Sequence, residues 1–182
     1  MKIGVTGSTC SGKTTFIDYL RFNLPDLRKK IELVTERASE CPYPLNEKGG
    51  FRTQWWIQSQ QIAKEYDVQG RADVVITDRT VFDSIPYLMI SSHSIEELRF
   101  VTQVAKQWNE LNPYNYILYF AVIPKDRLNL SDGAHIFQHR IDKNLRTIMS
   151  LNIDHKNIIY IPYQEKEKRC ENVLQLLNKL IG

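Results

Sequence analysis

The first sixteen residues, MKIGVTGSTCSGKTTF, place the tightest constraint on the fold. A short apolar run at 2–6 leads into a loop of small residues that matches G-x-x-x-x-G-K-[ST] at Gly7, Gly12, Lys13 and Thr14. The glycines allow backbone angles that turn successive N–H groups toward one oxyanion, and a following helix adds its positive end. The stretch is therefore predicted to be a strand, a phosphate-binding loop and the start of a helix.

The chemistry of this loop predicts ATP and Mg²⁺ as cofactors. Lys13 can reach the β- and γ-phosphates, and the hydroxyl of Thr14 can ligate Mg²⁺. Cys10 is interpreted as a small loop residue that contributes its backbone N–H, in preference to a redox sensor. A guanine-binding N-K-x-D motif is missing from the usable positions, which disfavours a signalling GTPase. The residues predicted to bind the nucleotide are Gly7, Ser8, Thr9, Cys10, Ser11, Gly12, Lys13, Thr14 and Thr15.

Apolar runs alternate with helical patterns along the rest of the chain. Strands are predicted at 2–6, 31–35, 73–77, 114–123 and 157–162, and helices at 51–68, around 80–90, 94–111 and near the end of the chain. DVVIT at 73–77 is continuously apolar, as expected for a strand that is buried on both faces. We predict an α/β fold of the three-layer P-loop NTPase type, with a five-stranded parallel sheet, helices on both faces and a single domain over 1–182.

Composition and charge exclude several classes of protein. The chain has 182 residues, 42% of them apolar and 25% charged, which is ordinary for a globular domain. A net charge of +3 does not favour nucleic acid as a partner. The three cysteines are widely spaced and form no metal-binding pattern with the histidines, and no apolar run approaches the length of a membrane helix. A cytoplasmic location without a membrane partner is the expectation.

Two carboxylates follow predicted strands, at the edge of the sheet where ligands bind. Asp78 comes directly after VVIT and is predicted to hold Mg²⁺ together with Thr14. Glu36 follows ELVT and is predicted to accept the proton of an attacking hydroxyl. For each carboxylate, the alternative is an exposed charge at the end of a strand.

Basic residues gather in a segment that is predicted to be a lid. They are Lys125, Arg127, Arg140, Lys143 and Arg146, together with His135 and His139, within 125–146. A mobile basic lid can neutralise the charge that develops during phosphoryl transfer. Arg127 and Arg140 are the lid candidates, whereas Lys143 and Arg146 fit a solvated helix face. SDG at 131–133 is predicted to be a turn that acts as a hinge.

The helix predicted at 51–68 combines aromatic, amide and basic side chains. Arg52, Trp56 and Gln60 are four residues apart and therefore share a face. Such side chains suit a planar base, through stacking and edge hydrogen bonds. Core packing is the alternative for at least one of the two tryptophans, Trp55 and Trp56.

These motifs together resemble the small P-loop kinases of the nucleoside and nucleotide kinase superfamily, over nearly the whole chain. TDRT at 77–80 resembles the Asp-Arg-Ser/Tyr motif of deoxynucleoside and thymidylate kinases, and Glu36 falls where deoxynucleoside kinases place their catalytic glutamate. ERASE at 36–40 is similar to a stretch in the nicotinamide riboside kinase branch. The lid departs from the family, because DGAH has His135 where relatives carry an arginine, while Arg140 matches a later lid arginine.

The resemblance implies an ATP- and Mg²⁺-dependent kinase that acts on a nucleoside, a nucleotide or a related small molecule. The catalytic candidates are Lys13, Glu36, Asp78, Arg79 and Arg140, and the acceptor-binding candidates are Glu36, Arg37, Arg52, Trp56, Gln60 and Arg79. Glu36 favours an uncharged hydroxyl, because a carboxylate repels a monophosphate, whereas Arg37, Arg52 and Arg79 could offset that repulsion and leave a monophosphate as the alternative.

Three questions stay open at this stage. The basic lid and the paired tryptophans leave a kinase that acts on a base or hydroxyl within DNA as one alternative. A non-catalytic nucleotide-binding switch is the other. A homodimer is equally compatible with the sequence.

Overall fold

The computed structural model describes residues 1–24, 29–36, 38–92 and 94–182. Within them, five strands form one sheet in the order β2-β3-β1-β4-β5, and every strand pair is parallel. The strands are β1 (Lys2–Thr6), β2 (Ile31–Val34), β3 (Val74–Asp78), β4 (Tyr116–Phe120) and β5 (Ile158–Ile161). The predicted five-stranded parallel α/β fold is confirmed.

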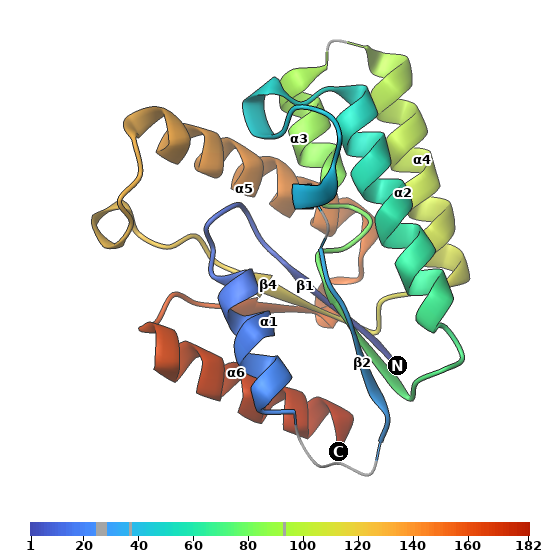
Figure 1. Cartoon of the computed structure of the whole chain (residues 1–182), viewed down its shortest axis with the longest axis vertical. Helices are drawn as coiled ribbons and strands as arrows, with labels where there is room; N and C mark the ends of the chain where they lie inside the picture. Colours follow the sequence, from blue (N-terminus) through green and yellow to red (C-terminus); the bar gives the residue numbers. More distant parts are fainter. Residues whose placement is uncertain (25–28, 37, 93) are drawn as a thin grey trace.

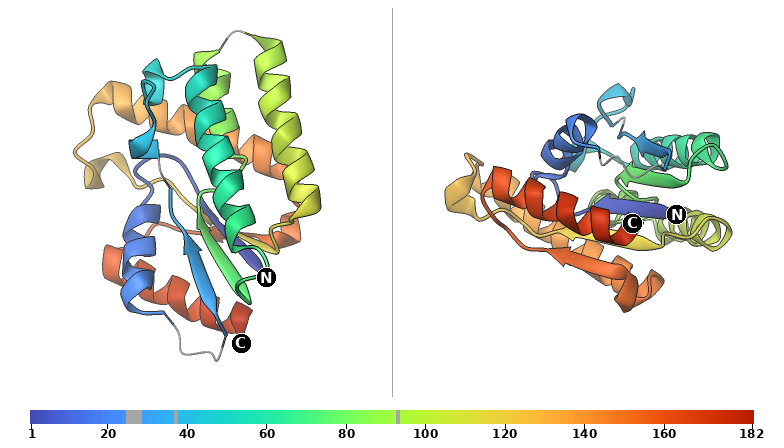
Figure 2. Two further views of the ribbon diagram at one scale, coloured as in Figure 1. Left: turned by 45° about the vertical axis from the view of Figure 1, so that its right-hand side comes forward. Right: turned by 90° about the horizontal axis from the view of Figure 1, so that it is seen from below.

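Helices cover both faces of this sheet (Figures 1 and 2). They are α1 (Lys13–Phe22), α2 (Phe51–Val68), α3 (Ser84–Ser91), α4 (Ile95–Leu111), α5 (Asp132–Asn152) and α6 (Lys166–Ile181). Side chains alternate along β4: Leu118 and Phe120 join the core beneath α1 and α6, while Ile117 and Tyr119 join the core beneath α3, α4 and α5. This alternation explains why the strand sequences read as continuous apolar runs.

The start of α5 differs from the prediction for SDG at 131–133. Ser131 is the N-cap of the helix, and its hydroxyl accepts a hydrogen bond from the backbone N–H of Ala134 at 3.3 Å. Serine is favoured at N-caps for this reason. The segment therefore begins a helix, and the predicted hinge turn is wrong.

Strand order places the loop after β1 at the centre of the carboxyl edge of the sheet. β1 pairs with β3 on one side and with β4 on the other, so that Val5 lies opposite Asp78 and Thr6 lies opposite Tyr119. The chain leaves β1 toward β2 and β3 first and later crosses to β4 and β5. Ligands of open α/β sheets bind at such a reversal of strand order.

Among the described residues, no helix is both long enough and apolar enough to span a bilayer.

Candidate active site

The loop between β1 and α1 has the backbone of a phosphate-binding loop. Gly7 and Gly12 adopt φ angles of 142° and 89°, in the range that favours glycine. A Cβ atom on Gly7 would lie 2.5 Å from the carbonyl oxygen of Phe120, so that no larger residue fits there. Cys10 adopts φ 53° and is exposed. These turns are the ones that direct successive N–H groups to one side of a loop.

Three carbonyl groups of this loop receive hydrogen bonds from side chains. Lys13 Nζ donates to the carbonyl of Ser8 at 2.7 Å. Gln138 Nε2 donates to the carbonyl of Thr9, and Arg169 Nη1 donates to that of Ser11, both at 2.8 Å. Gln138 lies on α5 and Arg169 on α6, so that two elements from late in the chain hold a loop from its start. Both side chains are buried. The sequence analysis missed both residues.

Lys13 is buried beneath the loop, with 5% of its surface exposed. Burial, assisted by the charge of the neighbouring Arg79, lowers the pKa of its amino group to about 8. Three carboxylates act in the opposite direction, namely Asp83, Asp78 and Glu36. The predicted catalytic residues at the ends of β2 and β3 are therefore close enough to influence the phosphate-binding lysine.

Asp78 has the properties of a magnesium ligand. It is the last residue of β3, and within the described chain its buried Oδ1 atom has no hydrogen-bond partner. Burial raises the pKa of this carboxyl group to about 6, although the charge of Arg79 opposes the shift. Thr14, the other predicted ligand, is exposed in the first turn of α1.

A carboxylate oxygen without a partner beside a phosphate loop fits Mg²⁺, which proteins often hold through one or two carboxylates together with substrate phosphates. The described residues contain no cluster of three or more His, Cys, Asp or Glu side chains that could hold a metal ion by themselves.

The turn between β3 and α3 is fastened to the end of β1. Asp83 accepts hydrogen bonds from the hydroxyl of Thr6 at 2.9 and 2.8 Å. It also accepts bonds from the backbone N–H and the hydroxyl of Thr80, at 2.9 and 2.6 Å. Because this turn occupies residues 80–83, the helix predicted around 80–90 begins only at Ser84.

Arg79 is held in an unusual backbone conformation in the same turn. Its φ angle is 76°, which is rare for a residue other than glycine and is concentrated at functional sites. Its N–H donates to the carbonyl of Val5 at 2.9 Å, and its own carbonyl accepts from Gln61 Nε2 at 3.2 Å. The side chain forms an ion pair with Glu36 at 2.6 Å and approaches Asp83 at 3.9 Å. The two predicted catalytic residues Glu36 and Arg79 are thus brought together.

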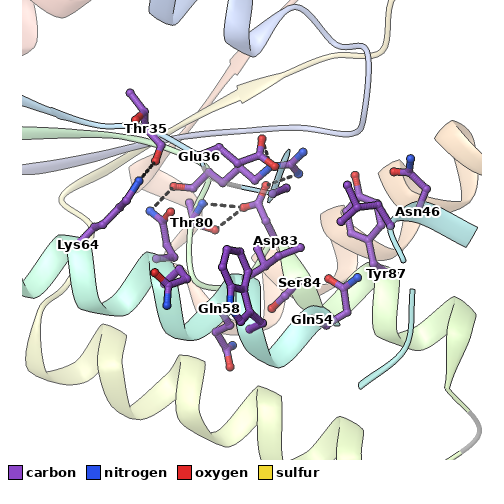
Figure 3. Close-up of a pocket in the computed structure, with 17 residues that line it drawn as sticks. Thr35, Glu36, Asn46, Gln54, Gln58, Lys64, Thr80, Asp83, Ser84 and Tyr87 are labelled. Atoms are coloured by element: carbon purple, nitrogen blue, oxygen red, sulfur yellow. Dashed lines mark hydrogen bonds and ion pairs between the residues drawn. The ribbon is translucent and has the colours of Figure 1, made fainter. Parts of the chain in front are cut away.

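A cavity opens between the end of β2, α2 and α3 (Figure 3). Four of the predicted acceptor-binding residues line it: Glu36, Arg79, and Trp56 and Gln60 of α2. The remaining lining residues are Thr35, Ala38, Leu45, Asn46, Gln54, Ile57, Gln58, Gln61, Lys64, Thr80, Asp83, Ser84 and Tyr87.

Polar side chains form a buried face of α2, and the sequence analysis did not single out two of them, Gln58 and Glu65. Gln54, Gln58, Gln61 and Glu65 recur at helical spacing and are all buried. Gln58 Nε2 donates to the carbonyls of Val81 and Val101, both at 3.0 Å, while its Oε1 atom has no partner within the described residues. The spacing of these polar residues is visible in the sequence and could have identified them.

The structure places the other predicted residues away from the cavity. Arg52 is exposed on α2 and Arg140 is exposed on α5, and the described lining of the cavity includes neither. Trp55 packs against Phe100 of α4, with ring centroids 4.9 Å apart, so that one of the two tryptophans belongs to the packing between helices. Arg37 lies outside the described residues.

A buried carboxylate at the base of α2 supports the turn that carries Arg79. Glu65 accepts hydrogen bonds from Lys2 at 2.9 Å, Gln61 at 2.9 Å, Trp108 at 2.7 Å and Tyr114 at 2.5 Å. Two of these donors also contact the turn: Gln61 donates to the carbonyl of Arg79, and the hydroxyl of Tyr114 accepts from the N–H of Val81 at 3.0 Å. The position of Arg79 therefore depends on a network that begins at the far end of the sheet.

No family model matches the sequence, and no curated protein matches it either. Solved structures do match. One is a deoxyadenosine kinase from M. mycoides with dCMP and dCDP bound as products; it has a TM-score of 0.67 and 15% identity, over 98% of this chain and 100% of that one. Another is a thymidylate kinase from Ehrlichia chaffeensis, with a TM-score of 0.66 and 14% identity, over 97% and 98% of the two chains.

These neighbours bear on the predicted resemblance. Both are kinases of nucleosides or nucleotides, so the predicted resemblance to that superfamily holds at the level of the fold, and neither supports the nicotinamide riboside branch. At 14–15% identity the likeness establishes the fold that this chain shares with them.

Proposed function

We propose that this chain is an ATP- and Mg²⁺-dependent kinase that phosphorylates a hydroxyl group of a nucleoside. The observation that carries the proposal is the position of the Glu36–Arg79 pair, which lines the cavity and acts electrostatically on Lys13 of the phosphate loop. A base and a cation at the meeting point of a phosphate site and an organic cavity are the parts that phosphoryl transfer requires.

Each group has a distinct role in this proposal. The loop N–H groups and Lys13 hold the phosphates, and Thr14 and Asp78 would hold Mg²⁺, which would supply positive charge to offset that of the phosphates. Glu36 accepts the proton of the acceptor hydroxyl as its oxygen bonds to the γ-phosphorus and the bond to ADP breaks. Arg79 balances the charge that develops on the transferred group.

The charges that line the cavity favour a nucleoside over a monophosphate. Arg79 is already paired with Glu36 at 2.6 Å, and Lys64 donates to the carbonyl of Thr35 at 2.7 Å. A phosphate on the acceptor would also meet the carboxylates of Glu36 and Asp83, which both line the cavity. Trp56 and the amide groups of α2 suit a base through stacking and edge hydrogen bonds. The M. mycoides kinase, which shares this fold, has dCMP bound as a product.

The test is ADP release with ATP and Mg²⁺ across a panel of nucleosides, nucleoside monophosphates, nicotinamide riboside and short DNA. We expect stimulation by nucleosides that is lost in Lys13→Ala and retained in Lys143→Ala, because Lys143 is exposed on α5. Glu36→Gln should lower kcat by about 10²-fold or more, the usual contribution of a general base.

Three results would replace the proposal. ADP release that responds to monophosphates alone would show that the acceptor is a nucleoside monophosphate. Stimulation by DNA that falls steeply with salt would favour the kinase that acts on nucleic acid. A protein that binds ATP but releases no ADP with any acceptor would act as a switch instead.

A further inference from the structure

Arg169 is a buried cation that the proposed reaction does not yet use. It lies in the first turn of α6, with 5% of its surface exposed, and its guanidinium stacks on the ring of Phe120 at 4.6 Å. Nη1 donates to the carbonyl of Ser11 in the phosphate loop at 2.8 Å. Nη2 donates to the carbonyls of Ala121 and Ile161, at 3.2 and 3.0 Å.

The guanidinium has no carboxylate partner in the described part of the chain, where its hydrogen bonds all go to carbonyl oxygens and its Nε atom has no partner. Glu165, which precedes α6, is exposed and pairs with Arg127 at 3.5 Å. A buried charge without a counter-ion is costly to fold, so such groups are found paired or bound to a ligand.

Arg146 is a useful comparison, because it is a second arginine that packs against aromatic rings. It also stacks on aromatic rings, those of Tyr119 and Tyr160, at 4.9 and 5.5 Å. Its Nε atom, however, donates to the carboxylate of Asp142 at 2.7 Å. The lack of a carboxylate at Arg169 therefore distinguishes it from an arginine in a similar aromatic setting.

The phosphate loop lies directly against this charge. A Cβ atom on Gly12 would lie 3.5 Å from Nη1 of Arg169, and the same nitrogen donates to the carbonyl of Ser11, so that the guanidinium contacts the backbone of the loop. Charges in a buried environment are screened far less than those on the surface. A triphosphate in the loop would therefore interact with Arg169 without touching it.

We propose that Arg169 is a positioning residue of the phosphate loop whose charge stays unbalanced until the phosphates of the nucleotide act as its counter-ion. The proposal rests on the proposed function, because it requires a triphosphate in this loop. Burial lowers the pKa of Arg169 to about 10, so the guanidinium is still charged at neutral pH.

The experiment separates the charge from the hydrogen bonds. Arg169→Gln removes the charge, and Arg169→Lys keeps it, while neither can reach all three carbonyls. Isothermal titration calorimetry would measure the binding of ATP and of inorganic tripolyphosphate, a probe that has the phosphates but no base. Arg146→Gln is the matched control.

We expect Arg169→Gln to weaken ATP and tripolyphosphate by the same factor, about tenfold or more, as for a lost charged interaction. Arg169→Lys should stay within about threefold of the wild type for both ligands, and Arg146→Gln should bind both as the wild type does. A Gln variant that binds tripolyphosphate normally would overturn the inference, whether or not ATP binding changes.

If the Gln variant does not fold, the Lys variant decides. A tenfold loss of tripolyphosphate affinity in Arg169→Lys, which retains the charge, would contradict the role of that charge. A wild-type protein that binds neither ATP nor tripolyphosphate would reject the proposed function itself, which is a different result.

Discussion

In the proposed function the carboxylate of Asp78 binds Mg²⁺, and its buried Oδ1 atom has no hydrogen-bond partner within the described residues. Burial disfavours the charged carboxylate and raises its pKa from 3.8 to about 6. The folded protein thus binds more protons than the unfolded chain between about pH 4 and 6, so its stability falls as pH rises through this window. Asp78→Asn should remove that fall and raise the free energy of unfolding at pH 8 by on the order of 2 kcal/mol.

Urea denaturation at pH 4.5 and pH 8 without Mg²⁺ checks this prediction. The difference in stability between the two pH values should be smaller in Asp78→Asn than in the wild type, even though the variant loses Mg²⁺-dependent activity. An unchanged difference would mean that another group causes the loss of stability. Asp126→Asn is a suitable control, because Asp126 is exposed.

Lys13 predicts a second pH dependence, in ligand binding and at alkaline pH. Its pKa is lowered to about 8 by burial and by Arg79, and only the charged amino group attracts phosphates. Above pH 8 the free protein loses this proton, so the affinity for ATP should fall by up to about tenfold per pH unit, with proton uptake on binding. Calorimetry at pH 7 and pH 9 in two buffers of different ionisation enthalpy measures both effects. The weak binding of Lys13→Met should not change in this way, and a wild-type affinity that is equal at both pH values would refute the assignment.

The segment between β3 and α3 is hydrogen-bonded, through Tyr114, to α2 and to the residues that lead into β4. Tyr114 donates to Glu65 at 2.5 Å and accepts from Val81 at 3.0 Å, and it is fully enclosed. Tyr114→Phe leaves a buried carboxylate and a buried N–H short of a partner, so we expect a loss of about 1–3 kcal/mol in the free energy of unfolding. Because Val81 follows the Arg79 turn closely, kcat should fall as well.

Tyr160→Phe is the control for this change, since Tyr160 is half exposed and its substitution should alter stability by no more than about 0.5 kcal/mol. Thermal unfolding and steady-state kinetics of both variants would be compared. A Tyr114→Phe protein that is less stable but has a normal kcat would show that the network supports the core without positioning Arg79.

Element positions could be predicted from the sequence because each depends on its own periodicity. The apolar runs located all five strands, and α2 was predicted with its observed bounds, 51–68. What the pattern could not show is which elements meet. Gln138 and Arg169 look like ordinary polar residues of amphipathic helices, and only the packing of α5 and α6 on the loop reveals that they bind its carbonyls. The position of Arg52 could not be predicted for a related reason. The buried polar face of α2 runs through Gln54 and Gln58, and Arg52 is exposed outside the cavity lining.

The molecule as a whole is organised around the reversal of strand order at β1. The phosphate loop leaves β1 with α1 on one side, while α5 and α6 bind its carbonyls from elements that follow β4 and β5. The cavity beside Glu36 and Arg79 is built from elements between β1 and β4, namely the end of β2, α2 and α3. The proposed nucleotide site therefore uses late elements, α5 and α6, that the cavity does not use, and the nucleotide should stabilise elements far from its loop in sequence.

Hydrogen exchange with and without Mg²⁺ and ATP tests this consequence. Ligand at about 100 times its Kd adds about 2.7 kcal/mol to the stability of the folded state, and slowed exchange should extend beyond the loop to the first turns of α6 and the part of α5 around Gln138. α4 serves as the internal control, because it packs on the opposite face from α1 and α6. Protection confined to the loop and α1 would show that the bonds from Gln138 and Arg169 open independently of the nucleotide, and the late elements would then be support for the fold alone.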